Sequence, residues 1–245
     1  MSASVIDIAE RFPIRFDTKR MMAELKVLEG SDWLDHYDKG LSNGWVAIPL
    51  VSLDGRMSDS EAQRAGTLDQ YKRTPFLERL PYFNEIVDSF KCPLGRVRVL
   101  KLLPGAKIGE HRDVGLEVAN LAFKRVRLHI PLQTNPDAVF FVDGERFHMR
   151  EGGLYYANFS KVHSVRNDGT TDRVHLVLDL QVNDWLAQFF PPATFPERVS
   201  SIAQRVSLPV FWKLRWWRTK YSVMLWKAYE GSPVQRLRHR ILGRA

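Results

Sequence analysis

Alternating apolar and polar positions dominate the middle of the chain, from residue 96 to residue 180. This period of two is typical of a β-strand, in which successive side chains face opposite ways. The segments that show it are 96–103, 125–134, 138–142, 145–149, 153–159 and 172–180. Turn-forming residues separate the segments, and Asp143-Gly144 between two apolar runs indicates a hairpin. Several short strands joined by regular turns predict a barrel or a sandwich.

Helical spacing of apolar residues appears on both sides of these strands. Residues 18–28 are predicted to form a helix with Thr18 as its N-cap, and residues 81–90 a helix opened by a proline. Three prolines between residues 191 and 196 end the strand pattern. We therefore predict a mainly β domain with flanking helices over residues 1–190, and a helical extension over residues 191–245.

The net charge of +8 belongs to this C-terminal extension. Residues 197–245 contain 11 Lys and Arg against 2 Asp and Glu, which leaves residues 1–196 with a net charge of −1. Residues 209–229 also hold four of the seven tryptophans, with an apolar stripe at helical spacing. A helix packed on the domain with its Lys and Arg reaching solvent is the first interpretation. Contact with an anionic membrane surface or with a protein partner is the alternative, and nucleic acid is disfavoured.

The composition limits the kinds of site that the chain can build. Apolar residues make up 44% and charged residues 26%, as in globular proteins. Cys92 is the only cysteine, so an internal disulfide and a thiolate metal cluster are excluded, and a metal would be bound by His and carboxylates. The first 16 residues lack the apolar run of a signal peptide, and no run of about 18 apolar residues occurs, so we expect a cytoplasmic protein.

A histidine and an aspartate two residues apart, in "GEHRDVG" (109–115), suggest part of a metal site. On an extended segment His111 and Asp113 point to the same side, and His163 at the end of a later strand offers a third ligand. Two histidines and one carboxylate form a facial triad, which leaves positions open on iron(II) for a bidentate cosubstrate and dioxygen. The pattern therefore favours a mononuclear iron site.

Cationic side chains share one face of the predicted strands. Arg127 and His129 alternate with apolar residues in 126–132, and Arg173 with His175 does so in 173–180. A sheet with one solvated face would explain a lone arginine. The set of Arg127, His129 and Arg173 suits a dicarboxylate, because guanidinium groups bind carboxylates through paired hydrogen bonds.

With these residues in place, the sequence resembles the aspartyl/asparaginyl β-hydroxylase family of iron(II)- and 2-oxoglutarate-dependent oxygenases. The matching stretches are "LLPGAKIGEHRD", "RVRLHIPLQTNPDAVFFVDGE" and "HSVRNDGTTDRVHLVLDL", within about residues 95–183. The resemblance implies a double-stranded β-helix of the jelly-roll or cupin type. It also implies the cofactors iron(II), 2-oxoglutarate and dioxygen.

The resemblance assigns a role to each candidate residue. It implies His111, Asp113 and His163 as iron ligands, Arg127 and His129 at the 1-carboxylate end of 2-oxoglutarate, and Arg173 at its distal carboxylate. Two departures from animal members bear on the substrate. Asp113 is present where some of them have glycine, which places the chain nearer bacterial members, including those that hydroxylate free proline. Leu100 stands where they have a serine against the distal carboxylate, so help for Arg173 must come from elsewhere.

Two functions from different classes follow. The first is a dioxygenase that hydroxylates an unactivated C–H bond of an amino acid, of an amino-acid residue on a peptide or carrier, or of an amide-linked acyl chain of a lipid. The reaction would release succinate and CO2. The second is a non-catalytic cupin-like binding module that docks to a membrane surface or a protein through residues 209–245. The arginine set distinguishes them, because a binding module has no need to place it.

Overall fold

The computed structural model describes residues 4–28, 30–35, 42–57, 66–113 and 124–191. The predicted extension, apart from its first residue, lies outside them, so the domain boundary at residue 190 stays a prediction. The strands are β1 (Val5–Asp7), β2 (Leu34–Asp35), β3 (Ser42–Leu53), β4 (Tyr71–Arg73), β5 (Leu94–His111), β6 (Arg125–Gln133), β7 (Ala138–Val142), β8 (Glu145–Phe147), β9 (Tyr155–Ala157), β10 (His163–Asn167) and β11 (Arg173–Gln181). The α-helices are α1 (Thr18–Glu24), α2 (Pro75–Glu78), α3 (Pro81–Ser89) and α4 (Asp184–Ala187).

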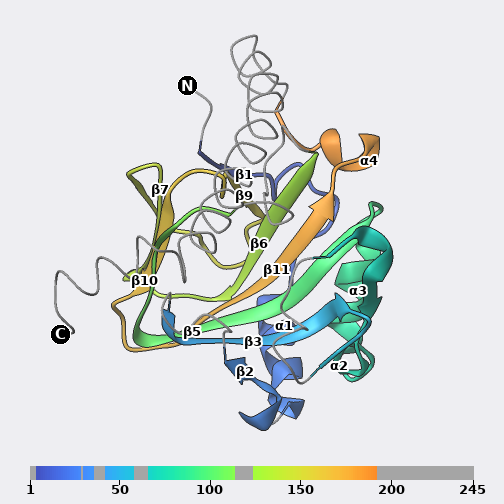
Figure 1. The fold of residues 1–245 in the computed structure, drawn as a ribbon, viewed down its shortest axis with the longest axis horizontal. Coiled ribbons are helices and arrows are strands. Elements are labelled where there is room, and N and C mark those ends of the chain that lie inside the picture. Colours follow the sequence, from blue (N-terminus) through green and yellow to red (C-terminus); the bar gives the residue numbers. More distant parts are fainter. Residues whose placement is uncertain (1–3, 29, 36–41, 58–65, 114–123, 192–245) are drawn as a thin grey trace, which may run out of the picture. The chain divides into compact units, whose positions relative to one another are not determined.

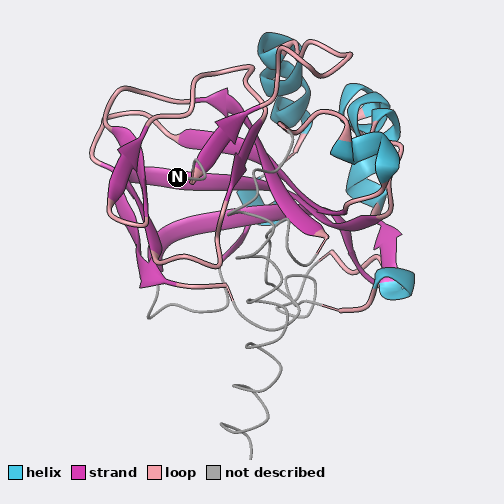
Figure 2. Ribbon diagram, turned by 90° about the horizontal axis from the view of Figure 1, so that it is seen from above, coloured by secondary structure: helices cyan, strands magenta, loops and turns pink. Residues whose placement is uncertain are grey.

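Two antiparallel rows of strands share the long strand β5 (Figure 1). One row runs β9-β6-β11-β5 and the other β8-β7-β10-β5. The first half of β5 pairs with β11 and its second half pairs with β10. Between the halves lies Gly105, whose φ of 74° suits glycine. This pairing is that of a double-stranded β-helix, as predicted, and Figure 2 shows the strands curving round with the helical segments along the outer side.

The alternation along β6 and β11 separates an apolar outer face from a polar inner face. The outer residues are buried against the N-terminal helices in one core, to which α1 contributes Met21 and α3 contributes Phe83 and Ile86. The strand residues of this core include Val126, Leu128, Ile130, Leu132, Val174, Leu176, Leu178 and Leu180. Burying these side chains stabilises the fold, by about 25 cal/mol for each Å² of apolar surface removed from water. The inner faces are thereby free to carry polar groups.

The hairpin predicted at Asp143-Gly144 joins β7 to β8. Both residues have positive φ, 55° and 83°, as a two-residue turn of this type requires. Helix α3 begins at Pro81, as predicted. The N-cap of α1 is a correction, because it is Asp17 and not Thr18. The Asp17 carboxylate accepts a hydrogen bond from the Arg20 amide at 2.9 Å.

Five strands were not predicted from the sequence, namely β1, β2, β3, β4 and β10. In β3 Ala47, Ile48, Leu50 and Val51 are all buried, so the strand lacks the period of two by which the others are found. Strand β10 begins at His163, whereas the sequence placed that histidine at the end of a strand. In the described part of the chain no helix is both long and apolar enough to cross a membrane.

Candidate metal centre

The three candidate metal ligands come together at the junction of β5 and β10. His111 is the last residue of β5 and pairs across the sheet with His163, the first residue of β10. Asp113 follows two residues after His111, and its amide donates to the Phe159 carbonyl at 3.0 Å. One potential ligand atom from each of His111, Asp113 and His163 lies within 4.8 Å of the other two. Strand pairing thus joins His111 and His163, which are 52 positions apart in the sequence.

Backbone carbonyls set the orientation of both histidines. Nδ1 of His111 lies 2.8 Å from the Gly109 carbonyl oxygen, and Nδ1 of His163 lies 2.9 Å from that of Lys161. A carbonyl can only accept, so each Nδ1 carries the ring hydrogen and each Nε2 keeps its lone pair for a metal. Burial and the neighbouring His111 also lower the pKa of His163 to about 3, which keeps this imidazole neutral. The donor set of two imidazoles and one carboxylate fits a divalent transition metal.

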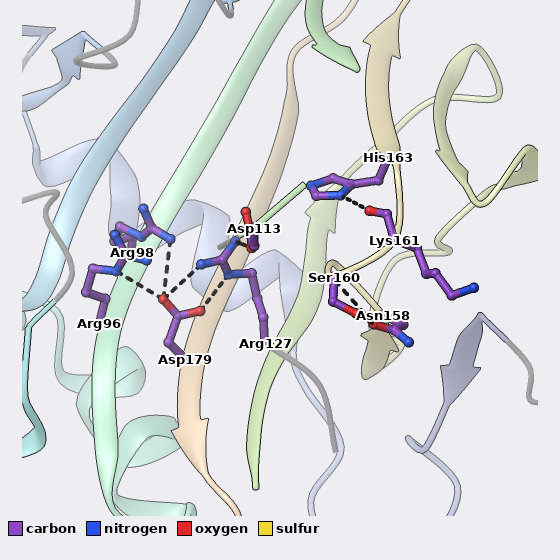
Figure 3. A network of polar contacts seen from close by, with 9 residues as sticks. All are labelled: Arg96, Arg98, Asp113, Arg127, Asn158, Ser160, Lys161, His163 and Asp179. Carbon is purple, nitrogen blue, oxygen red and sulfur yellow. Dashed lines mark hydrogen bonds and ion pairs between the residues drawn. The ribbon is translucent and has the colours of Figure 1, made fainter. Parts of the chain in front are cut away.

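Arg127 links Asp113 to a second carboxylate, Asp179 (Figure 3). Its Nη1 donates to Asp113 Oδ2 at 2.6 Å, while Nε and Nη2 donate to the two oxygens of Asp179 at 2.5 and 3.2 Å. Asp179 lies opposite Arg127 in the pairing of β11 with β6. The Arg127 guanidinium therefore fixes the orientation of the Asp113 carboxylate. The predicted contact of Arg127 with 2-oxoglutarate stays a prediction.

Asp179, Arg96 and Arg98 were not found by the sequence analysis. Arg96 Nε lies 3.1 Å and Arg98 Nη2 3.7 Å from Asp179 Oδ2, in the group drawn in Figure 3. Burial by itself would raise the pKa of Asp179, but Arg127, Arg96 and Arg98 outweigh it and hold the pKa well below its ordinary value. A signal was available for the aspartate. Position 179 continues the inner-face alternation of Arg173 and His175 along β11.

Arg173 lies at the opposite end of the inner face of β11 and is 2% exposed. Its guanidinium carbon is 4.6 Å from the centre of the Phe140 ring, and its Nη2 is 2.9 Å from Nδ1 of His175. Within the described residues no carboxylate forms an ion pair with it. Burial lowers the pKa of Arg173 to about 9. A buried cation of this kind provides a place for an anionic group of a ligand.

His129 and His175 complete this second polar group. Their Nδ1 atoms are 3.3 Å apart, and both side chains are buried. Nε2 of His129 has no hydrogen-bond partner among the residues described. Leu100, opposite His175 in the sheet, packs with Ala47 and Val177. The polar neighbour of Arg173 is therefore His175, and the help of another residue at the distal carboxylate stays a prediction.

Comparison with known proteins agrees with this geometry. The family model described as aspartyl/asparaginyl beta-hydroxylase matches residues 14–182. The chain belongs to this family.

Two curated relatives of this family member are L-proline hydroxylases. The L-proline cis-4-hydroxylase of Rhizobium meliloti (strain 1021) is 28% identical over 201 residues, which are 80% of this chain and 64% of the relative. The L-proline cis-3-hydroxylase 1 of a Streptomyces species is 28% identical over 172 residues, 68% of this chain and 58% of the relative. The chain thus spans about three fifths of the length of these relatives. A solved oxidoreductase of the 2OG-Fe(II) oxygenase family from Burkholderia pseudomallei has a TM-score of 0.44 at 17% identity, covering 67% of this chain and 77% of that one.

Proposed function

We propose that this chain is an iron(II)- and 2-oxoglutarate-dependent dioxygenase that hydroxylates a free amino acid, with L-proline as the first candidate. The observation that carries the proposal is the meeting of His111, Asp113 and His163, with one ligand atom from each within 4.8 Å of the others. Membership of the family and the names of the two proline hydroxylases support the choice of substrate. The peptide-linked, carrier-linked and lipid-linked substrates stay as less supported members of the same reaction class.

Each candidate site residue would have its own role in this reaction. His111, Asp113 and His163 would hold iron(II), which with 2-oxoglutarate and dioxygen supplies an oxidant strong enough to hydroxylate an unactivated C–H bond, giving succinate and CO2. Arg127 spreads the charge of Asp113 and fixes the direction of its carboxylate through the 2.6 Å contact. Arg173 would bind the distal carboxylate of 2-oxoglutarate through paired hydrogen bonds. His129 and Arg127 would contact the 1-carboxylate end.

The buried Arg173 favours the enzyme over the binding module. A module that binds neither cosubstrate nor metal gains nothing from a buried cation without a carboxylate partner in the described structure, because burial without a partner costs stability. Orientation of both imidazoles by carbonyl groups likewise serves a metal. Docking through residues 209–245 lies outside the described residues. It stays a prediction, as does a cytoplasmic location with peripheral membrane contact.

The experiment that tests the proposal is aerobic incubation with iron(II), 2-oxoglutarate and L-proline. Mass spectrometry should detect equal amounts of succinate and of proline that has gained one oxygen atom. His163→Ala is the matched inactive control. Loss of a residue that hydrogen-bonds to a metal ligand weakens metal binding by roughly 10–100-fold, and loss of the ligand His163 itself should weaken it by more. A folded, iron-loaded protein that neither binds 2-oxoglutarate nor forms succinate with any free amino acid would favour the binding module.

A further inference from the structure

Three buried side chains form a chain of contacts at the Arg173 end of β11. Nη2 of Arg173 is 2.9 Å from Nδ1 of His175, and that same Nδ1 is 3.3 Å from Nδ1 of His129. The exposed fractions are 2%, 1% and 4% for Arg173, His175 and His129. The Phe140 ring packs against all three. Water therefore has little access to these polar atoms, and their hydrogens must satisfy one another.

The contacts decide where the ring hydrogens lie. A guanidinium group only donates, so Nδ1 of His175 is an acceptor and His175 carries its hydrogen on Nε2. As a hydrogen bond, the 3.3 Å contact between the two Nδ1 atoms then has His129 as its donor, and Arg173 and His129 share the one lone pair of His175 Nδ1. Burial and the charge of Arg173 hold the pKa of both histidines well below the ordinary value, so each ring has only one hydrogen. Nε2 of His129 is left as a bare acceptor, and no described group donates to it.

This arrangement cannot receive a carboxylate at His129. A carboxylate only accepts, so Nε2 of His129 has to carry a hydrogen before the two can form a hydrogen bond. His129 must then give up the hydrogen on Nδ1, which becomes an acceptor and needs a donor at Nδ1 of His175. His175 can supply that donor only when Arg173 has turned away from it. An acidic group of a ligand is what would draw Arg173 away, because a charge-assisted bond to carboxylate is stronger than one to neutral imidazole.

We propose that His175 is a positioning residue that couples recognition of the two carboxylates of the cosubstrate. Binding of the distal carboxylate to Arg173 releases Nδ1 of His175. The Nδ1 proton of His129 then passes across the 3.3 Å contact to Nδ1 of His175, which donates it back to His129 in a hydrogen bond. Nε2 of His175 gives up its proton to water, and Nε2 of His129 takes up one from water and donates it to the 1-carboxylate. Each ring loses one proton and gains one, so no net charge is gained. The coupling rests on the proposed function and makes the site selective for a dicarboxylic over a monocarboxylic 2-oxo acid.

Nitrogen NMR of protein labelled with ¹⁵N-histidine tests this proposal directly. Zinc, which is diamagnetic, takes the place of iron at the metal centre. Without ligand, His129 should have its hydrogen on Nδ1 and His175 on Nε2. Saturation with 2-oxoglutarate should reverse both, whereas 2-oxopentanoate, which has the same chain length without the distal carboxylate, should leave both unchanged. The same tautomers before and after 2-oxoglutarate binds would overturn the coupling alone, and failure of 2-oxoglutarate to bind would overturn the proposed function as well.

Calorimetry gives an independent test, in which one variant should change the affinities for 2-oxopentanoate and 2-oxoglutarate in opposite directions. In His175→Leu the His129 ring no longer depends on Arg173, so 2-oxopentanoate should bind more tightly than to the wild type, by up to about tenfold, the effect of one hydrogen bond. 2-Oxoglutarate should bind more weakly, because His129 loses the hydrogen bond that His175 donates to it in the bound state. His175→Asn should restore the wild-type preference, because an amide can accept from Arg173 or donate to His129. The control is His148→Asn, at an exposed histidine. If His175→Leu bound both ligands more weakly by the same factor, His175 would have a structural role only.

Discussion

The two ends of the inner face of β11 each hold a buried charge, and the two charges differ in whether the described structure pairs them with an opposite charge. At one end Asp179 is surrounded by Arg96, Arg98 and Arg127, and Arg127 continues to the candidate ligand Asp113. At the other end, six residues and about 20 Å along the strand, Arg173 has a histidine and an aromatic ring beside it but no carboxylate ion pair in the described structure. Both ends follow the same alternation of the strand.

The difference separates what the protein needs in order to fold from what it needs in order to bind. Charges that are matched within the chain hold the Asp113 carboxylate in a fixed direction whether or not a ligand is present. Arg173 lacks an anionic partner in the described structure, and a ligand carboxylate would supply one. Substitutions at the two ends should therefore change different properties. Loss of a matched charge should lower stability, and loss of Arg173 should lower ligand affinity.

The largest effect is expected for Asp179→Asn. The neutral amide leaves Arg96, Arg98 and Arg127 without their shared carboxylate, and removing one partner from a buried ion pair costs about 3–5 kcal/mol. Chemical denaturation measures this loss in the free energy of unfolding. The control is Asp172→Asn, whose surface pair with Lys101 at 3.7 Å contributes at most about 1 kcal/mol. Equal losses in the two variants would contradict the view that the Asp179 group stabilises the fold.

Arg173→Met should show the reverse pattern. Loss of the charge-assisted hydrogen bonds to a carboxylate should raise the KM for 2-oxoglutarate by about 10–100-fold. The free energy of unfolding should rise by about 1 kcal/mol, because an apolar side chain replaces a buried cation. Arg166→Met is a matched control, since Arg166 also lies over a ring, that of Phe141, but is exposed and pairs with Asp168. A stability loss in Arg173→Met as large as that in Asp179→Asn would remove the distinction between the two ends.

The sequence was sufficient for six of the eleven described strands and for the candidate triad, and insufficient for the contacts between strands. Period-two alternation found most strands and the inner face of β11, and the spacing of His111, Asp113 and His163 pointed to the metal centre. The same alternation would have found Asp179 had it been followed two positions beyond Val177. The meeting of His129 with His175 was out of reach, because it depends on a register shift between Val174 and His175 where β11 pairs with β6. Alternation along one strand does not fix its register against another.

The smallest effect concerns the dependence of stability on pH. Histidines in the unfolded chain take up protons below about pH 6.5, whereas burial and nearby arginines keep the pKa of His129 and His175 far below that value in the folded protein. The unfolded state therefore binds more protons, so stability is retained above pH 6.5 and falls as acid is added, by about 1 kcal/mol for each such histidine between about pH 6.5 and 5.5. Denaturation at several pH values should give His175→Leu a shallower fall than the wild type by that amount. An unchanged slope in His175→Leu would mean that His175 is protonated in the folded protein, which would also remove the reason for Arg173 to donate to it.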